Sequence, residues 1–513
     1  MKIPPLSLRF AVLFACVCAL NAAQPPYRVL YSNDTTHISS SPSPFKPEPA
    51  GFQEEFLRAS ISEAKGADTV QMLQPGLGWV PWWKSEHFPM EKHAAFLATV
   101  GHRLNGYENY VLRGGDMIAV LLDECKKINR AAFVSIRMND THHVMRGNRA
   151  KNPEDKERMM SEFALFVEHP EARVDMSKTT KIEQQPYAMD WASPFVREHK
   201  YRLLEEICKN YDIDGLELDF MRQWVMFNPD RTSEKERTDI ITEFVASIRK
   251  ALDDNAPNGK HRWLCVRVPG YLWTQKQAGI DLKRLADVGV DMFNIAGHYN
   301  TDFQIETQQA KKIVGPNKFV YAEAHFAHAR GPKSPGGPDY LKRNTPIQFY
   351  TFAHVQYARG IDGVSFFNFP YYRGTHSPTD VPGEPAEPPF EVLEHIGDPQ
   401  WVARQPQQYV LGALRNQPRR DTPRPFEKKM KAGQAETLML DMAPPAQGWK
   451  LDGKLRIQSR ESLQGCEFEV RLNGRKLTAT ADVSNPLPDP YSVAQGDPED
   501  YRAWIVPQTA PKN

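Results

Sequence analysis

The sequence has little cysteine, almost no net charge, and no long apolar run after its first residues. Six of 513 residues are cysteine, and 64 Lys and Arg stand against 63 Asp and Glu, for a formal net charge of +1. A chain without a basic excess lacks the field that binds polyanions, so we expect no nucleic-acid partner. No later run is long enough for a transmembrane helix, so we expect no membrane span.

The cysteines and histidines form no metal-binding or disulfide pattern. Two cysteines lie near the N-terminus and the other four are widely spaced, with Cys208 and Cys265 inside apolar patterns that indicate buried thiols. The first strand-like run has no His-X-His, and no segment contains His-Glu-X-X-His. We therefore expect no metal and no cofactor.

Residues 1–23 resemble an export signal. Lys2 and Arg9 are basic, residues 10–20 are apolar, and a small-residue exit follows. The bulky Phe14 does not suit a lipoprotein box, so we expect ordinary cleavage and a secreted or periplasmic protein without a lipid anchor.

Residues 212–222 contain a short strand-like run that carries two acidic residues. Leu216 and Leu218 occupy one parity of a short strand-like run, and Glu217 and Asp219 occupy the other. Such a strand buries an apolar face and directs two carboxylates the opposite way.

Eight strand-like runs alternate with helical patterns, which predicts an α/β fold of the (β/α)8 TIM-barrel type over residues 24–410. The fourth run holds Glu217 and Asp219, and the other seven are 27–31, 69–73, 131–138, 263–269, 291–296, 318–323 and 363–368.

Residues 411–513 predict a small all-β, sandwich-like domain. Segments 438–440, 454–457 and 468–474 alternate in the manner of strands, and the last ends on an Asn-Gly turn. This domain either covers the barrel or holds a polymer.

Strand parity selects the side chains that face the barrel mouth, where reactive groups of this fold lie. The third run directs Ser135, Arg137 and Asn139 inward, and the other inward residues are Arg267, Asn294, His298, Tyr321 and Glu323. Asp219 and Glu323 then face each other across the mouth.

Paired carboxylates suit glycosidic bond cleavage, which needs one protonated acid and one ionised base or nucleophile. Nearby arginines favour an ionised Asp219, and alanine neighbours favour a protonated Glu323. The reverse assignment stays open. We expect Glu217 to pair with an inward arginine and orient Asp219, although a purely structural ion-pair network fits the same residues.

The loop 74–115 contains three tryptophans whose rings either stack on sugars or plug the barrel. The loops after the first and third runs begin Asn33-Asp-Thr and Asn139-Asp-Thr, which suits hydrogen bonding to substrate hydroxyls. The expected substrate-binding residues are Arg137, Asn139, Asp140, His142, Arg222, Arg267, His298, Tyr299, His325, Trp79, Trp82 and Trp83.

Four arginines, Arg137, Arg222, Arg330 and Arg373, predict a positive mouth on a neutral protein. Guanidinium groups suit carboxylate or sulfate groups, so the hypothesis is an anionic glycan.

The motif Asp214-Gly-Leu-Glu-Leu-Asp219 after an arginine-bearing third strand resembles the family-10-like glycosyl hydrolases, over roughly residues 27–372. It is distantly similar to the strand-four motif of family-18 chitinases. In this chain Met221 stands where those enzymes have their acid and Glu217 where they have the middle aspartate, so substrate-assisted chemistry is not implied. The strand-four and strand-seven pair also resembles the retaining barrel glycosidases, without their strand-four Asn-Glu.

The sequence thus predicts a glycoside hydrolase acting on a polysaccharide or oligosaccharide. Two alternatives remain: a catalytically silent carbohydrate-binding barrel, and a metal-dependent hydrolase of another bond, which the clustered histidines would serve. The pattern does not determine the sugar, the linkage, the stereochemical outcome or the oligomeric state.

Overall fold

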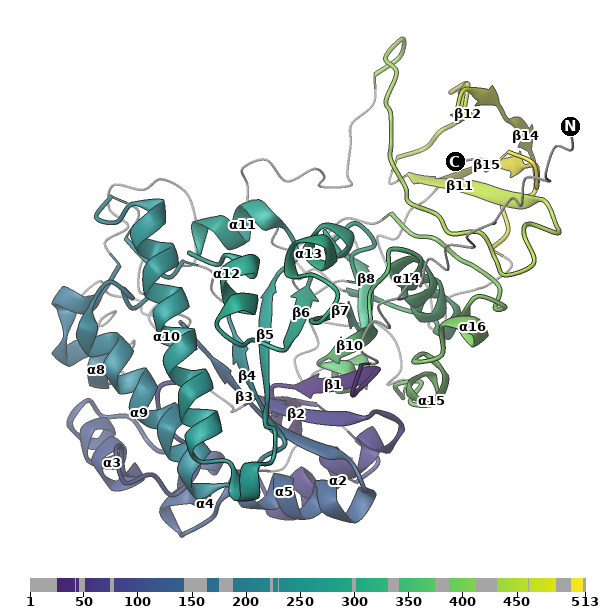
Figure 1. Cartoon of the computed structure of the whole chain (residues 1–513). Helices are drawn as coiled ribbons and strands as arrows, with labels where there is room; N and C mark the ends of the chain where they lie inside the picture. Colours follow the sequence, from purple (N-terminus) through teal and green to yellow (C-terminus); the bar gives the residue numbers. More distant parts are fainter. Residues whose placement is uncertain are drawn as a thin grey trace, which may run out of the picture.

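A closed barrel of eight parallel strands forms the centre of the computed structural model, in the order β1-β10-β7-β6-β5-β4-β3-β2 (Figure 1). The structure describes residues 25–41, 43–45, 51–73, 78–142, 164–174, 188–221, 225–228, 230–297, 301–330, 341–373, 387–411, 431–459, 461–485 and 500–510. The predicted signal segment 1–23 lies outside these residues. The TIM-barrel prediction is confirmed.

The eight barrel strands overlap the eight runs expected from the sequence, with bounds that differ by at most two residues. They are β1 (Val29–Asn33), β2 (Thr69–Leu73), β3 (Ala131–Arg137), β4 (Gly215–Asp219), β5 (Trp263–Pro269), β6 (Met292–Ala296), β7 (Phe319–His325) and β10 (Gly363–Phe367).

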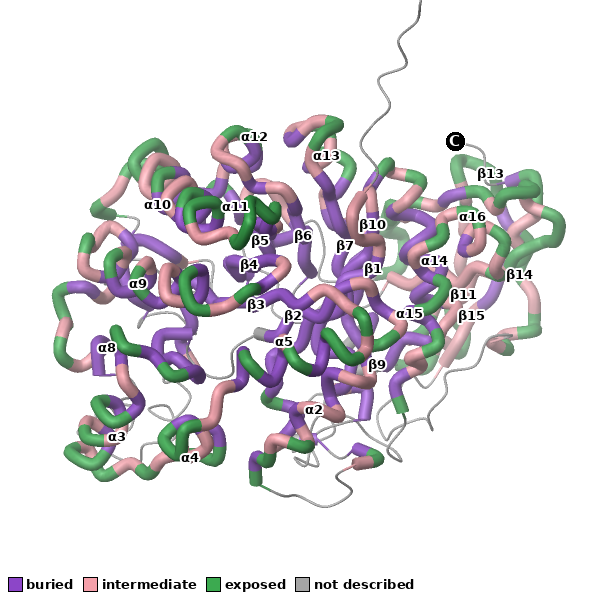
Figure 2. The backbone as a smooth tube through the Cα atoms, turned by 60° about the horizontal axis from the view of Figure 1, so that its bottom comes forward, coloured by how far each residue is buried: buried purple, intermediate pink, exposed green. Residues whose placement is uncertain are grey.

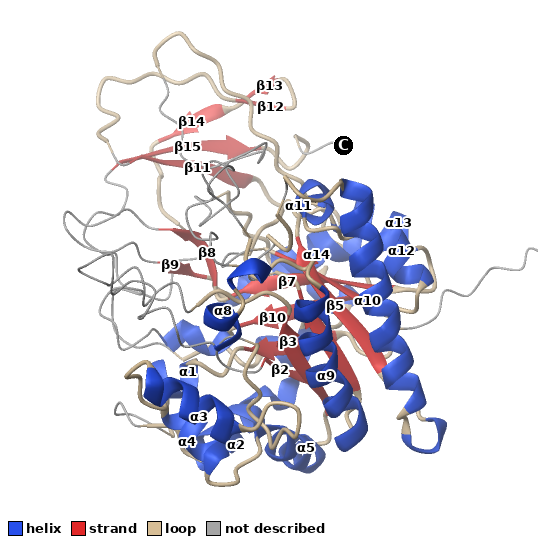
Figure 3. Ribbon diagram, turned by 90° about the vertical axis from the view of Figure 1, so that its left-hand side faces the viewer, coloured by secondary structure: helices blue, strands red, loops and turns tan. Residues whose placement is uncertain are grey.

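Helices surround the barrel and bury their apolar faces against its outer side (Figure 3). The longer ones are α2 (Glu54–Ser62), α3 (Met90–Thr99), α4 (Gly106–Leu112), α5 (Met117–Ile128), α9 (Pro194–Asn210), α10 (Glu234–Asp254), α13 (Thr307–Val314) and α14 (Pro346–Ala358). The shorter ones are α1 (His37–Ser40), α8 (Ala164–Glu168), α11 (Leu272–Gln277), α12 (Leu282–Asp287), α15 (Val392–His395) and α16 (Pro399–Val402), with 3-10 turns η1 (Glu63–Gly66), η2 (Pro170–Ala172), η3 (Pro257–Gly259) and η4 (Phe369–Arg373). No helix among the described residues is both long and apolar enough to cross a membrane.

Helix α10 illustrates how the sequence fixes these outer elements. Ser233 accepts a hydrogen bond from the Glu236 backbone, and the Glu236 side chain accepts one from the Ser233 backbone, which completes a capping box. Ile241, Val245 and Ile248 follow at helical spacing and are buried. The apolar stripe therefore turns toward the barrel and the charged face toward solvent.

The barrel strands are buried along nearly their whole length (Figure 2), and their alternate residues pack into two separate cores. Outward residues such as Leu216 and Leu218 join the layer between strands and helices, whereas Leu30, Phe133 and Tyr321 form a separate apolar cluster inside the lower barrel. Polar inward residues lie above this cluster, toward the carboxyl ends of the strands. This arrangement places polar and charged side chains at the mouth.

Small antiparallel sheets follow the barrel. Strands β11 (Gly453–Ser459), β15 (Asp500–Val506) and β14 (Thr478–Thr480) form one sheet, and β12 (Arg471–Leu472) pairs with β13 (Arg475–Lys476). The predicted Asn-Gly turn joins β12 to β13, with both residues at positive φ, 48° and 82°.

Two details differ from the sequence-based prediction. Segment 438–440 is not a strand and pairs with none of the strands that the structure describes; the carbonyl of Met439 instead accepts a hydrogen bond from Gln304 on the barrel. A short hairpin, β8 (Ala327–Arg330) with β9 (Leu341–Arg343), follows β7 and was not expected.

Candidate active site at the carboxyl ends of the strands

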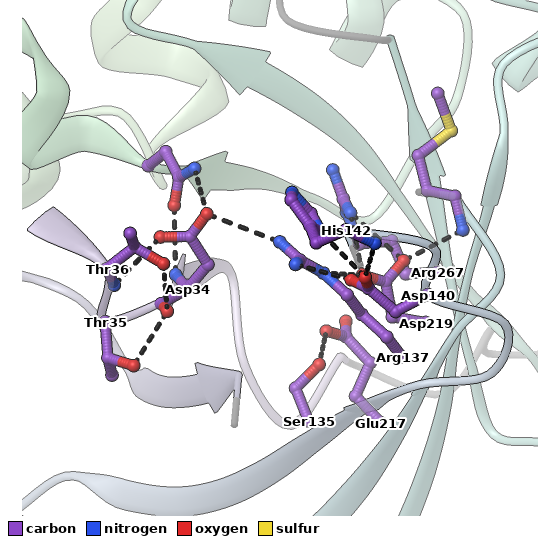
Figure 4. Close-up of polar contacts among 12 residues, drawn as sticks. Asp34, Thr35, Thr36, Ser135, Arg137, Asp140, His142, Glu217, Asp219 and Arg267 are labelled. Atoms are coloured by element: carbon purple, nitrogen blue, oxygen red, sulfur yellow. Dashed lines mark hydrogen bonds and ion pairs between the residues drawn. The ribbon is translucent and has the colours of Figure 1, made fainter. Parts of the chain in front are cut away.

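Three inward residues stand side by side across neighbouring strands. The register pairs Arg137 of β3 with Asp219 of β4, and Asp219 with Arg267 of β5. Because parallel strands end at the same edge of the sheet, these charged groups meet at one level (Figure 4). The parity prediction for these residues is confirmed.

Arg267 joins the two carboxylates that the sequence singled out. Its Nη1 lies 3.0 Å from Oδ1 and 3.1 Å from Oδ2 of Asp219. Its Nε and Nη2 donate to the two carboxylate oxygens of Glu323 at 2.5 and 2.7 Å. The guanidinium carbon also lies 3.9 Å from the ring centroid of Phe367. One cation thus holds the carboxylates of β4 and β7.

Burial acts on both members of the Glu323–Arg267 pair. Desolvation raises the pKa of Glu323, while Arg267 opposes that rise. Desolvation also disfavours the charged guanidinium, yet Asp219 and Glu323 together raise the pKa of Arg267 above its ordinary value. Arg267 is therefore a permanent cation, and Glu323 is the carboxyl that burial pushes toward its protonated form.

Glu217 lies one layer below Asp219 and is fully buried. The Ser135 hydroxyl donates to its Oε1 at 2.7 Å, and the side chains of Cys265 and Asn294 lie 3.5 Å from its Oε2. Burial, followed by the Asp219 charge, raises the pKa of Glu217 to about 7. Arg267 lowers the pKa of Glu217 through its charge, but neutral groups fill the hydrogen bonds of Glu217, so the expected pairing with an arginine is electrostatic and not a direct contact.

Arg137 is held from two sides by aspartates that end different strands. Its Nη1 donates to Asp140 at 2.7 Å, its Nη2 donates to Asp34 at 3.3 Å, and its Nε lies 4.0 Å from Asp219. Burial opposes its charge, but the three carboxylates raise the pKa of Arg137. Both Asp34 and Asp140 belong to the Asn-Asp-Thr segments noted in the sequence. Their carboxylates hold this arginine, a role that sequence reasoning missed for Asp34.

Asp34 is fixed by a residue that follows the last barrel strand. Its backbone N–H donates to the Asn368 side chain at 2.9 Å, and the Asn368 amide donates back to the Asp34 carboxylate at 2.9 Å. Asn368 follows β10 with φ 52°, a left-handed conformation that asparagine tolerates better than most residues. The Asn-Asp-Thr sequence occurs at the ends of two strands, and this repeat could have indicated that Asp34 has the same role as Asp140.

His142 is the most exposed member of this cluster, with 30% of its side chain accessible. Its Nδ1 lies 2.6 Å from Oδ1 of Asp140, and its backbone N–H donates to the same oxygen at 2.8 Å. Asp140 therefore connects the imidazole to Arg137 (Figure 4).

The arginines do not produce a positive mouth. Each guanidinium of the cluster meets two or three carboxylates, and Arg373 is bound to Glu63 and Glu387 instead of facing the site. Arg222 and the side chain of Arg330 lie outside the described residues. The described arginines thus lend no support to a positive mouth, and the anionic-glycan hypothesis stays a prediction.

The three loop tryptophans are buried, with 1% of Trp79, 5% of Trp82 and 1% of Trp83 exposed. The indole N–H of Trp79 donates to the Asp140 carbonyl at 3.2 Å, and that of Trp83 donates to Glu206 at 3.3 Å. These rings pack the loop against the barrel and present no open face to a sugar, which corresponds to the plug alternative.

The remaining predicted binding residues fall into two groups. The Asn139 amide donates to the carbonyls of Met189 and Val225, both at 2.9 Å, so it ties neighbouring loops together. His325 is buried beside the ring of Phe367. His298 and Tyr299 lie outside the described residues, so their predicted role stays a prediction.

The described part of the chain contains no group of three or more His, Cys, Asp or Glu side chains that could hold a metal ion.

Comparisons with known proteins find similar solved structures but assign the chain to no family. No family model matches the chain, and no curated protein matches it.

Among solved structures, alpha-L-fucosidase isoenzyme 2 from Paenibacillus thiaminolyticus is 11% identical with a TM-score of 0.41, over 72% of this chain and 48% of that one. The PgaB (BpsB) glycoside hydrolase domain from Bordetella bronchiseptica is 12% identical with a TM-score of 0.41, over 67% and 94%. A family 18 N-acetylglucosaminidase from Paenibacillus barengoltzii is 14% identical with a TM-score of 0.35, over 66% and 94%. All three are glycosidases by name, but likeness at this level does not extend to residues or chemistry.

Proposed function

We propose that this chain is a glycoside hydrolase that cleaves glycosidic bonds of a polysaccharide or oligosaccharide. The observation that carries the proposal is the meeting of Asp219 from β4 and Glu323 from β7 on the single guanidinium of Arg267. Two carboxyl groups at the carboxyl ends of barrel strands supply the acid and the base or nucleophile that this reaction needs.

The environments of the two groups support different roles. Burial raises the pKa of Glu323, which favours a carboxylic acid that protonates the glycosidic oxygen. Asp219 accepts hydrogen bonds from Arg267 and from the Met221 backbone N–H at 2.8 Å, contacts that suit a base or nucleophile. When Glu323 is protonated, Arg267 retains Asp219 as its counter-ion. No metal takes part in this scheme.

The test is reducing-end release from a panel of neutral and anionic glycans by wild type, Asp219→Asn and Glu323→Gln. We expect each variant to lose about 100- to 10,000-fold in turnover, the range of general acid–base catalysis. The matched controls are Asp212→Asn and Glu198→Gln, whose side chains are 61% and 59% exposed and lie outside the site. These controls should cleave like wild type.

A leaving-group comparison assigns the roles. Loss of the acid spares aryl glycosides with acidic phenol leaving groups, whereas loss of the nucleophile or base does not. We therefore expect Glu323→Gln to retain activity on activated aryl glycosides and Asp219→Asn to lose it. The opposite result reverses the roles, and full activity of both folded variants on all substrates contradicts the proposal.

A second candidate, a carbohydrate-binding barrel without catalysis, is favoured by one observation. The Asp219 and Glu323 side chains are 0% exposed and ion-paired, as in a structural network. That function predicts glycan binding by wild type and by Asp219→Asn, with no product from either.

A further inference from the structure

A buried lysine outside the barrel reaches the backbone that carries the site. Lys200 lies in α9 and is 0% exposed. Its ammonium group donates to the carbonyl of Gly78 and, at 3.0 Å, to that of Arg137 at the end of β3. It also lies 3.8 Å from the ring centroid of Trp79. One side chain thus joins a helix, a loop and a barrel strand.

The loop that Lys200 contacts is interlocked with the same strand end. The Trp79 carbonyl lies 3.0 Å from Nε2 of His199, the neighbour of Lys200, and the Trp79 indole donates to the Asp140 carbonyl. Gly78 has φ +64°, and a Cβ there would lie 2.7 Å from the Arg137 carbonyl oxygen. The loop therefore packs against β3 without space for a side chain.

Burying an amine in this position is costly for the fold. Burial lowers the pKa of Lys200 well below its ordinary value, and Asp140 opposes that effect. A buried amine costs free energy unless hydrogen bonds compensate, and here the carbonyls of Gly78 and Arg137 accept them. Lys200 is therefore better explained by the backbone carbonyls that it holds in place than by a gain in stability.

We propose that Lys200 is a positioning residue that holds the end of β3 so that Arg137 and Asp140 face Asp219. This inference rests on the proposed function of the Asp219 site. It assigns the catalytic geometry partly to helix α9, which contributes no group to the mouth.

The chain offers a matched control at the C-terminal end of α9. Arg262 is 2% exposed and donates to the carbonyls of Cys208 and Tyr211 at 2.6 and 2.8 Å. It performs the same kind of carbonyl capping, but just before β5, at the end of the barrel away from the mouth. Arg262→Met therefore removes a comparable contact without touching the site.

The experiment compares Lys200→Met with Arg262→Met in kcat, KM, melting temperature and hydrogen–deuterium exchange of residues 134–142. We expect Lys200→Met to lower kcat by about 10- to 100-fold, the usual effect of losing a group that supports catalytic residues, with little change in KM. Exchange over residues 134–142 should increase. Arg262→Met should reduce stability and leave kcat and that exchange unchanged.

The outcomes separate the inference from the proposed function. Unchanged exchange over residues 134–142 in Lys200→Met overturns the positioning role, as does an equal loss of kcat in Arg262→Met. If wild type cleaves no glycan, the proposed function fails while the exchange result still decides what Lys200 holds. Should Lys200→Met not fold, Gly78→Ala disturbs the same contact from the loop and should also increase exchange there.

Discussion

Glu217 is the acid whose charge state the barrel interior changes most clearly. Burial and the Asp219 charge raise its pKa from the ordinary value of 4.5 to about 7. In that pH window the folded protein binds a proton that the unfolded chain has released. Stability from this group is therefore greatest at the acidic end of the window and falls as pH rises toward 7.

Glu217→Gln removes this titration while keeping the side-chain shape. We expect the variant to gain stability relative to wild type as pH rises through the window, by about 3 kcal/mol in total, since one pKa unit corresponds to about 1.36 kcal/mol. Urea unfolding of both proteins from about pH 5 to about pH 8 measures the difference. A difference that does not change with pH would show that Glu217 titrates normally in the folded protein.

Part of the site followed from the sequence and part did not. Strand parity was enough to direct Asp219, Arg267 and Glu323 inward, because alternate residues of a barrel strand must face opposite sides. Strand parity does not predict which side chains contact one another. Asp34 holding Arg137, and the neutral contacts of Glu217, depend on where distant strands come together, which no local pattern encodes.

At the scale of elements, all eight barrel strands were predictable because buried parallel strands read as short apolar runs between helical patterns. The hairpin of β8 and β9 was not, since its strands are short and, among the described strands, each pairs with the other alone. Segment 438–440 shows the reverse failure. An alternating, apolar stretch is not a strand unless a partner strand lies beside it.

Strand β4 begins with a glycine for a packing reason. A Cβ on Gly215 would lie 2.2 Å from the ring of Phe133 on β3, inside the lower barrel. We expect Gly215→Ala to reduce the free energy of unfolding by about 1–3 kcal/mol, the usual cost of overpacking. Adding Phe133→Leu should recover part of that loss in a double-mutant cycle followed by denaturant unfolding. Strict additivity of the two changes would mean that the ring and the glycine do not compete for space.

At the scale of the whole molecule, a stretch beyond the predicted boundary at residue 410 returns to the barrel. Arg359 pairs with Asp441, the Pro444 carbonyl lies 2.9 Å from His354, and the Tyr409 hydroxyl donates to the Ala443 carbonyl at 3.0 Å. Ala443 is buried among these contacts. The residues that complete the barrel surface therefore extend past the proposed domain boundary.

Two truncated chains test where the folded barrel domain ends. We expect a chain ending at residue 410 to have a clearly lower melting temperature than one ending at residue 451, because only the longer chain keeps the contacts of residues 439–446. The chain ending at 451 should unfold close to the full-length temperature, since it loses only the C-terminal sheets. Equal melting temperatures for the two truncations would place the boundary at 410 after all.

The barrel closes where β1 pairs with β10, and the Asp34–Asn368 contact spans 334 residues. During synthesis the first strand therefore leaves the ribosome long before its last neighbour exists, and its open edge must wait. Arg137 gains one of its two aspartate anchors in its final place only after that closure. The reactive centre is thus completed only after residue 368 has been synthesised, and a shorter nascent chain contains Arg137 and Asp34 without the geometry that joins them.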